Sequence, residues 1–397
     1  MKKKFSNFLV VTVIAVIVLS LVGIALVSQA KSEPARKIVV FKPGISDEVK
    51  ENLVKKAGGV KIKDLKLIEG KAVLLSLQAE KDLARQFGVL RIDDDVVVEA
   101  LIRGGIAAKP TPTQPSEVLP WGVDRIDAEK VWGITTGDPI KVAIVDTGID
   151  VKHPDLIDNL KGGVSTVGYT SSYNDDNGHG THVAGIAAAI DNEIGVIGVG
   201  PQIDLYAVKV LDRRGSGYLS DVIEGLDWAI QNKMEVVNMS LGTSSNVASF
   251  QETVQRVYAA GITQVAAAGN TGGAVIYPAA YPEVIAVSAT DSTDTLASWS
   301  SRGPEIDLAA PGVSIYSTYK GQTYKTLSGT SMAAPHVTGA AALVLTQVAK
   351  CDTDSSGSCS PAEVQQRLEA TAEDLGTVGR DDLYGSGLVD AEKAVTY

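Results

Sequence analysis

Three polar residues of the chain could together perform nucleophilic catalysis. Ser331 lies in the segment Ser-Gly-Thr-Ser-Met-Ala-Ala-Pro-His, and because proline is tolerated only near a helix start, Ser331 should open a helix. A serine hydroxyl is a weak nucleophile until a base, usually a histidine held by a carboxylate, accepts its proton. His179, in Asn-Gly-His-Gly-Thr-His, is the candidate base, and Asp146, directly after the apolar run 142–145, is the candidate carboxylate. Taken alone, Ser331 would equally suit a helix cap and Asp146 a turn.

The elements that must position these residues are short strands alternating with helices. Strands so uniformly apolar are buried on both faces, which predicts an α/β fold with a mainly parallel sheet flanked by helices. Functional residues of such sheets gather beyond the carboxyl ends of the strands, where Asp146 stands. The predicted strands are residues 142–145, 205–210, 236–240, 263–268 and 284–289.

A smaller unit precedes this sheet. Its pattern of strand, helix, two strands, helix and strand predicts a split βαβ unit, a small α+β domain of the ferredoxin-like kind. A piece of roughly 65 residues is marginally stable alone and would gain from docking on a partner. The segment 104–115, with Gly-Gly and three prolines, is typical of an exposed linker. The expected strands are 37–41, 65–68, 72–77 and 89–98, and the expected helices are 47–57 and 80–87.

Charge limits the possible partners. The chain has 397 residues with 36 basic and 47 acidic side chains, a net charge of -11. Residues 1–30 carry +3, residues 31–101 carry 14 - 12 = +2, and residues 102–397 carry 19 - 35 = -16. Nucleic acids and anionic membranes bind basic surfaces, so neither is an expected partner. A slightly basic front piece could sit on the acidic remainder.

The first thirty residues predict export. Three lysines precede an apolar run at 8–27 and the small residues Ser28 and Ala30, as in a signal peptide. The run is nearly long enough to cross a bilayer, so an uncleaved anchor that tethers the protein to the outer face of the membrane is the alternative. In an oxidising compartment Cys351 and Cys359 could form a disulfide, or they could remain two unlinked thiols.

The segments around Asp146, His179 and Ser331 resemble those of the subtilisin-like serine proteases, in that family's order, over roughly residues 117–397. The resemblance implies a serine endopeptidase of broad specificity that forms an acyl-enzyme. It assigns Asp146 as the orienting carboxylate, His179 as the base and Ser331 as the nucleophile. Asn270 matches the family's oxyanion-hole residue, although an asparagine after glycine also suits a turn.

The resemblance also implies how protein and peptide substrates bind. Ser240, Leu241 and Gly242 match an edge segment that pairs with an extended peptide through main-chain hydrogen bonds. Ile276 stands at the base of the primary specificity pocket, where family members often carry a small or polar residue.

The front piece, residues 31–101, resembles the family's propeptide, a folding assistant and intramolecular inhibitor. Self-cleavage is expected between Leu101 and Ile102. The linker 102–117 and a monomeric catalytic domain, residues 118–397, would follow.

Two calcium sites are predicted. For the first site, the resemblance implies side-chain oxygens from Glu117, Asp155 and Asn192. It also implies carbonyl oxygens from the loop residues Ile190, Ile194 and Val196. Hard oxygen ligands suit calcium, although an exposed acidic turn would look similar.

The second site rests on spacing alone. Residues 352–363 follow an EF-hand loop, with Gly357 in the sixth position. Its ligands would be Asp352, Asp354, Ser356, the carbonyl of Ser358, and Glu363. The alternative is a capping box of Ser360 and Glu363 that opens the next helix.

Two rival functions remain. A non-catalytic binding or inhibitory module could keep this fold, and labelling with a serine-directed fluorophosphonate would separate it from an enzyme. A membrane-tethered processing enzyme of narrow substrate range is the other, and the sequence of the mature N-terminus would identify it.

Overall fold

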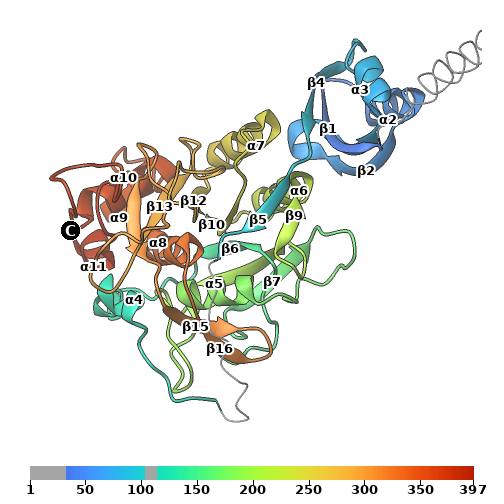
Figure 1. Ribbon diagram of the computed structural model, residues 1–397. Helices are drawn as coiled ribbons and strands as arrows, with labels where there is room; N and C mark the ends of the chain where they lie inside the picture. The colour runs from blue at the N-terminus through green and yellow to red at the C-terminus, as the bar shows by residue number, and fades with distance from the viewer. Residues whose placement is uncertain (1–32, 103–113) are drawn as a thin grey trace, which may run out of the picture.

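The computed structural model describes residues 33–102 and 114–397, so the predicted signal segment and most of the linker lie outside it. A small N-terminal unit sits on a larger domain (Figure 1). Within the described residues no helix has the length and apolar character needed to cross a membrane.

The large domain is built on a seven-stranded sheet in the order β14-β13-β12-β10-β6-β8-β7, with every neighbouring pair parallel. This confirms the predicted α/β fold. β7 and β14 were not predicted, because one is rich in glycine and polar residues and the other is short and ends in proline. The strands are β6 (Lys141–Asp146), β7 (Leu160–Ser165), β8 (Asp204–Lys209), β10 (Val236–Met239), β12 (Thr263–Ala267), β13 (Ile285–Thr290) and β14 (Leu308–Pro311).

Helices cover both faces of this sheet (Figure 1). α5 (His179–Ala188) and α8 (Thr330–Leu345) pack together on one face, and α6 (Leu219–Gln231) and α7 (Ala248–Ala259) pack on the other. α8 is buried from Thr330 to Val344, and its small side chains let it lie close to the strands beneath it. Shorter elements complete the domain: α4 (Trp121–Arg125), η2 (Glu129–Val131), α9 (Val348–Cys351), α10 (Pro361–Thr371), α11 (Ala391–Thr396) and the hairpin β15 (Ile315–Tyr319) and β16 (Thr323–Leu327).

The small unit is a four-stranded antiparallel sheet in the order β2-β3-β1-β4 with two helices, as the split βαβ pattern predicted. Its elements are β1 (Ala35–Phe41), α2 (Asp47–Lys56), β2 (Val60–Leu65), η1 (Lys66–Ile68), β3 (Gly70–Leu75), α3 (Leu77–Leu83) and β4 (Val89–Asp94).

Four of its predicted elements have wrong boundaries. The third strand covers residues 70–75 rather than 72–77, because the chain leaves the sheet at Ser76, which caps the next helix. The second strand covers residues 60–65 rather than 65–68, because an exposed edge strand accepts the lysines that interrupt its apolar pattern. The second helix begins at Leu77, since the Ser76 side chain accepts a hydrogen bond from the Ala79 amide and caps it there. The predicted strand 89–98 is two strands, β4 and β5 (Val97–Ala100).

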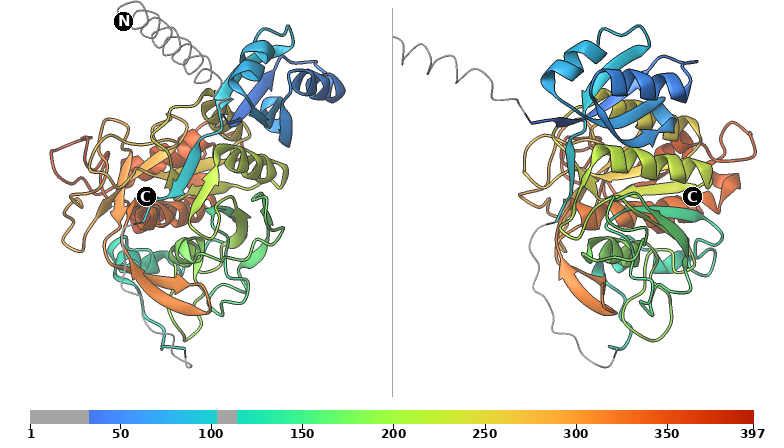
Figure 2. Two further views of the ribbon diagram at one scale, coloured as in Figure 1. Left: turned by 45° about the vertical axis from the view of Figure 1, so that its right-hand side comes forward. Right: turned by 90° about the vertical axis from the view of Figure 1, so that its right-hand side faces the viewer.

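The small sheet is covered on both faces. α2 and α3 pack on the face that carries Val39 and Phe41. The face that carries Ile38 and Val40 packs on the larger domain, over α6 and α7 (Figure 2). β5 then leaves the small unit and pairs antiparallel with β11 (Leu241–Gly242) and β9 (Ser216–Tyr218) of the large one. This path carries residues 97–101 over the carboxyl edge of the main sheet.

Candidate active site

Asp146 and His179 form a close, buried pair. Asp146 is the last residue of β6, and His179 is the first residue of α5. His179 Nδ1 lies 2.8 Å from Asp146 Oδ1 and 2.9 Å from Oδ2, and both side chains are fully buried. A proton on Nδ1 therefore donates to the carboxylate and leaves Nε2 as an acceptor. Nε2 has no hydrogen-bond partner in the described part of the chain, so this nitrogen is available to a hydroxyl proton.

Ser331 is the second residue of α8. Pro335 lies in the second turn rather than the first, and because it has no N–H, it leaves the Ser331 carbonyl without its usual helical donor. The Ser240 hydroxyl donates to that carbonyl at 2.9 Å, while the Ser331 hydroxyl donates to the Ser240 carbonyl at 2.9 Å. Proton transfer requires the Ser331 hydroxyl to exchange this acceptor for His179 Nε2, an adjustment that substrate-free sites commonly need.

A hydrogen-bond donor lies beside the helix start. Asn270 Oδ1 accepts from the Thr330 amide and the Thr330 hydroxyl, both at 2.9 Å, which fixes the orientation of its side-chain amide. Asn270 Nδ2 is buried and has no partner among the described residues. A Cβ atom placed on Gly329 would lie 3.2 Å from this Nδ2 and 2.5 Å from the Leu101 carbonyl oxygen. The Leu101 carbonyl and the Asn270 side-chain amide therefore both border the turn before Ser331.

The strand that brings Leu101 to this position is held by main-chain contacts. β5 pairs Ala100 with Leu241 and Glu99 with Gly242 on one side, and it pairs with β9 on the other. The Ala100 amide donates to the Gly215 carbonyl at 2.9 Å, and the Leu101 amide donates to the Ser240 carbonyl at 3.3 Å. The predicted segment from Ser240 to Gly242 thus lines an extended peptide, here the chain's own residues.

Ile276 lies beside the same cleft. A Cβ atom on Gly242 would approach Ile276 Cδ1 to 2.6 Å, and one on Gly269 would approach Ile276 Cγ1 to 3.3 Å. The isoleucine side chain therefore fills space between two glycines that border the Leu101-binding region. A glycine at position 276 would leave this space open.

Asp155, a predicted ligand of the first calcium site, is fully buried and lies beside other predicted ligands of that site. Its carboxylate accepts from Asn192 Nδ2 at 3.1 Å and from the Val196 amide at 3.0 Å, and Glu117 Oε1 accepts from the Asn192 amide at 2.8 Å. Burial raises the pKa of Asp155 to about 6, with a smaller contribution from the neighbouring Glu117 carboxylate. Two facing acids with oxygen-rich surroundings fit a hard cation, which would relieve their repulsion. The loop that supplies Ile190, Ile194 and Val196 wraps this point, with Ile190 N donating to the Asp155 carbonyl.

The loop of residues 352–363 contains features of both a calcium site and a helix-capping box. Carboxylate oxygens of Asp352, Asp354 and Glu363 lie within 4.8 Å of one another. Glu363 also makes the capping box, because it accepts from the Ser360 amide while the Ser360 hydroxyl accepts from the Glu363 amide. Main-chain and side-chain donors, led by the Ser360 amide, lower the pKa of Glu363 to about 2.

The remaining predicted ligands of this loop bond to each other. The Ser356 hydroxyl donates to the Ser358 carbonyl at 3.0 Å. Cys351 and Cys359 form a disulfide that closes the loop, which settles the alternative left open by the sequence.

Sequence reasoning missed one buried group next to the Asp146–His179 pair. Asp175 is buried and contacts both the residue after Asp146 and the first turn of α5. The only signal was its place four residues before His179, in a pair of consecutive aspartates.

A serine at a helix start, a buried histidine–aspartate pair and an extended peptide across the carboxyl edge of a parallel sheet are the elements of a serine hydrolase.

Comparison with known proteins agrees with this class. A family model described as the Subtilase family matches residues 137–387. The chain is 40% identical to subtilisin E of Bacillus subtilis over 375 residues, 92% of this chain and 91% of that protein. It is 48% identical over 282 residues to a thermostable alkaline protease of Halalkalibacterium halodurans, covering 70% of this chain and 74% of that protein. Over 281 residues it is 47% identical to subtilisin Savinase of Lederbergia lenta, covering 70% of this chain and 99% of that protein.

The chain belongs to the subtilase family, and it is a serine endopeptidase.

Proposed function

We propose that the chain is the precursor of a secreted endopeptidase in which Ser331 is the nucleophile, His179 the base and Asp146 the group that orients the base. Ser331 Oγ attacks the carbonyl carbon of an extended substrate while its proton passes to His179 Nε2. The peptide C–N bond breaks as the imidazolium returns that proton to the leaving amine. Water then attacks the acyl-enzyme ester while His179 accepts the proton of the water. The ester bond breaks, and the proton returns to Ser331 Oγ.

Asn270 and the Ser331 amide act as the donors to the oxyanion. The Asn270 amide is fixed by Thr330, so it need not reorganise when negative charge develops on the carbonyl oxygen. The residue that approaches these donors in the precursor is Leu101.

The placement of the Leu101 carbonyl carries this proposal. It lies against Gly329, directly after a strand that is hydrogen-bonded on both sides, as a scissile residue would. Cleavage between Leu101 and Ile102 would release residues 31–101 as a propeptide and leave residues 102–117 at the new N-terminus of the catalytic domain, residues 118–397.

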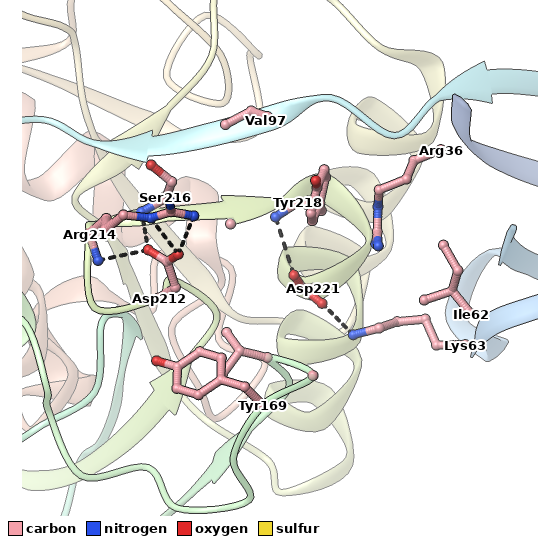
Figure 3. A pocket seen from close by; sticks show the side chains of 13 residues that line it. Arg36, Ile62, Lys63, Val97, Tyr169, Asp212, Arg214, Ser216, Tyr218 and Asp221 are labelled. Carbon is pink, nitrogen blue, oxygen red and sulfur yellow. Dashed lines mark hydrogen bonds and ion pairs between the residues drawn. The ribbon is translucent and has the colours of Figure 1, made fainter. Parts of the chain in front are cut away.

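The propeptide would stay bound as an inhibitor because its sheet and its charges face the enzyme. Lys63 Nζ contacts the Asp221 carboxylate (Figure 3). It also contacts the Glu224 carboxylate and the Thr166 carbonyl. The Arg36 guanidinium lies 3.6 Å from the Tyr218 ring centroid, and Arg91 pairs with a glutamate of α7 at 2.6 Å. The contacts of Lys63 with Asp221 and of Arg36 with Tyr218 border a cavity of about 540 Å³ between the two units, so these charged groups act at the edge of the packed interface.

Substrates are proposed to be proteins and peptides bound as an extended strand against Ser240–Gly242. Main-chain recognition supports broad specificity, which Ile276 would restrict by narrowing the primary pocket.

Calcium is the proposed cofactor. Glu117, Asp155 and Asn192 with the loop 190–196 fit a first ion, and Asp352, Asp354, Ser356, Ser358 and Glu363 are candidates for a second. The ions would supply no chemistry to the reaction and would hold loops in place.

The location and assembly are also proposals. The N-terminal segment supports secretion, with a membrane tether as the alternative, and a monomer is the proposed assembly. Sequencing the mature N-terminus and measuring the mass in solution test both.

The central experiment is Ser331→Ala in the full precursor, expressed without other proteases. The variant should remain uncut, and hydrolysis of a peptide substrate should fall by roughly 10⁴-fold or more. Fluorophosphonate should label the wild type and not the variant. Appearance of the mature fragment at the wild-type rate would overturn the proposal.

A further inference from the structure

A buried carboxylate outside the triad ties the two triad segments together. Asp175 is 4% exposed. Its Oδ1 accepts from the Thr147 hydroxyl at 2.9 Å, the Asn177 amide at 2.9 Å and the Gly178 amide at 2.8 Å. Its Oδ2 accepts from the Thr181 amide at 3.0 Å and the Thr181 hydroxyl at 2.6 Å. Five donors therefore converge on one carboxylate at the start of α5.

This hydrogen-bond pattern favours the charged form. Three of the five partners are backbone amides, which can only donate, and they reach both Asp175 oxygens. Burial raises the pKa of Asp175, and the five donors act in the opposite direction by stabilising the anion. Asp175 thus places a negative charge at the end of the helix that begins with His179.

That charge matters because the site must form an imidazolium. The N-terminus of a helix carries partial positive charge, which disfavours a cation on its first residue. His179 occupies that position in α5, so the helix alone would lower the basicity of its imidazole. Asp146 compensates from the Nδ1 side. Asp175 compensates at the helix end, through the first-turn amides of Gly178 and Thr181.

The same carboxylate also fixes geometry. Thr147 directly follows Asp146, and its amide donates to Asp146 Oδ1 at 2.7 Å. The Thr147 hydroxyl donates to Asp175 and accepts from the Gly180 amide at 2.9 Å. The end of β6 and the first turn of α5 are therefore cross-linked through Thr147 and Asp175.

The other charged or titratable groups around this helix end do not duplicate this role. Lys209 of β8 is buried and pairs with Asp176 at 2.7 Å, which adds no net charge. Burial lowers the pKa of His182 to about 3, so it is neutral. Further groups face the same region from other loops and from the hairpin: Asp150, Asp212, Arg213, Arg214, Tyr319 and Lys320.

We propose that Asp175 is a positioning residue that raises the basicity of His179 and holds it in register with Asp146, an inference that rests on the proposed catalytic roles. Removing its charge should make His179 a weaker base. The acidic limb of the pH profile of kcat/KM reports the protonation of that base, so it should move to lower pH.

The test is Asp175→Asn in the mature enzyme, assayed with a peptide substrate from about pH 5 to pH 9. The midpoint of the acidic limb should fall by about 0.5 to 1 unit, and kcat should fall by about tenfold with little change in KM. The matched control is Asp150→Asn. Asp150 is also buried, but its carboxylate accepts from the amides of Gly321, Gln322 and Lys152 and from none of the first turn of α5. In Asp150→Asn the midpoint of the acidic limb should move by less than about 0.2 pH unit.

A lower rate with an unshifted midpoint in Asp175→Asn, or an equal shift in both variants, overturns the proposal. If Asp175→Asn does not mature, Thr147→Val decides, because it removes the cross-link and keeps the charge. It should lower kcat and leave the midpoint in place, and an unchanged kcat overturns the proposal. Fluorophosphonate labelling of the wild type at Ser331 separates these outcomes from a failure of the proposed triad.

Discussion

The two units of the chain bury their sheets in different ways. The seven-stranded sheet is covered by helices of its own domain, α5 and α8 on one face and α6 and α7 on the other. The four-stranded sheet has only α2 and α3, and its second face is covered by α6 and α7 of the larger domain. The larger domain is thus self-sufficient in its layers, and the small unit is not.

This difference is compatible with the proposal that the small unit is an inhibitor from which the catalytic domain is later separated. Cutting the chain after Leu101 removes no layer from the catalytic domain. It leaves the small unit dependent on non-covalent contacts, part of which are charged and lie at the edge of the interface. Stability of the propeptide and affinity for the enzyme should therefore be linked.

The largest expected effect is the loss of structure when the small unit is separated. Its own core has eight buried apolar residues, so a peptide of residues 33–101 should be largely unfolded in circular dichroism. Adding Ser331→Ala enzyme that has been matured in trans by the wild type and freed of its own small unit should restore the helical signal. The same enzyme without the peptide should already unfold cooperatively. A peptide that unfolds cooperatively alone, with several kcal/mol of stability, would break the comparison.

Charge reversal at Lys63 should weaken the bound propeptide next most strongly. Its side chain is 14% exposed and faces two carboxylates, so Lys63→Glu should raise the inhibition constant of the propeptide by about 10- to 100-fold. Lys61→Glu is the control, since Lys61 pairs only within the small unit. Glu224→Lys in the enzyme should recover part of the loss. Equal effects of the Lys63 and Lys61 variants would remove Lys63 from the interface.

Ile276→Gly should change the substrate preference and leave propeptide binding almost unchanged. Opening the space beside Gly242 should improve cleavage after Phe and Tyr by about tenfold relative to cleavage after Leu, measured with peptide libraries. The inhibition constant of the propeptide should move by less than about threefold, because its sheet provides most of the contact. An unaltered preference for Phe and Tyr would place Ile276 outside the pocket.

The sequence predicted what depends on local pattern and could not predict what depends on distant contacts. Apolar strands placed Asp146 at a sheet edge, and the two glycine-flanked helix starts placed His179 and Ser331. The sequence did not predict the edge strand of residues 60–65, because its lysines interrupt the apolar pattern and are tolerated only at an exposed position. The carboxylate partners of Lys63 lie about 160 residues away in the sequence. The sequence did not single out Asp175, because its hydrogen bonds form only when the end of β6 and the start of α5 lie side by side.

The smallest predicted effect concerns the loops that make the catalytic domain independent of its propeptide. If calcium binds at residues 352–363, Asp352, Asp354 and Glu363 repel one another without it, so the metal should raise the unfolding temperature of the mature enzyme. Glu363→Gln should reduce this calcium-dependent gain by a few degrees, about 1 kcal/mol for a domain of this size. Glu117→Gln, in the first predicted site, should reduce it more, because Asp155 beside it is fully buried and its burial raises the cost of an uncompensated charge. Glutamine can also complete the capping box, but its neutral amide accepts weaker hydrogen bonds than the carboxylate, so Glu363→Gln should lower the unfolding temperature slightly at every calcium concentration. The decisive quantity is therefore the slope of the titration rather than its starting point. The titration should be run with the Cys351–Cys359 disulfide intact and reduced, since the bond holds the loop closed without metal. Identical calcium dependence in wild type and Glu363→Gln would leave Glu363 with the role of a helix cap alone.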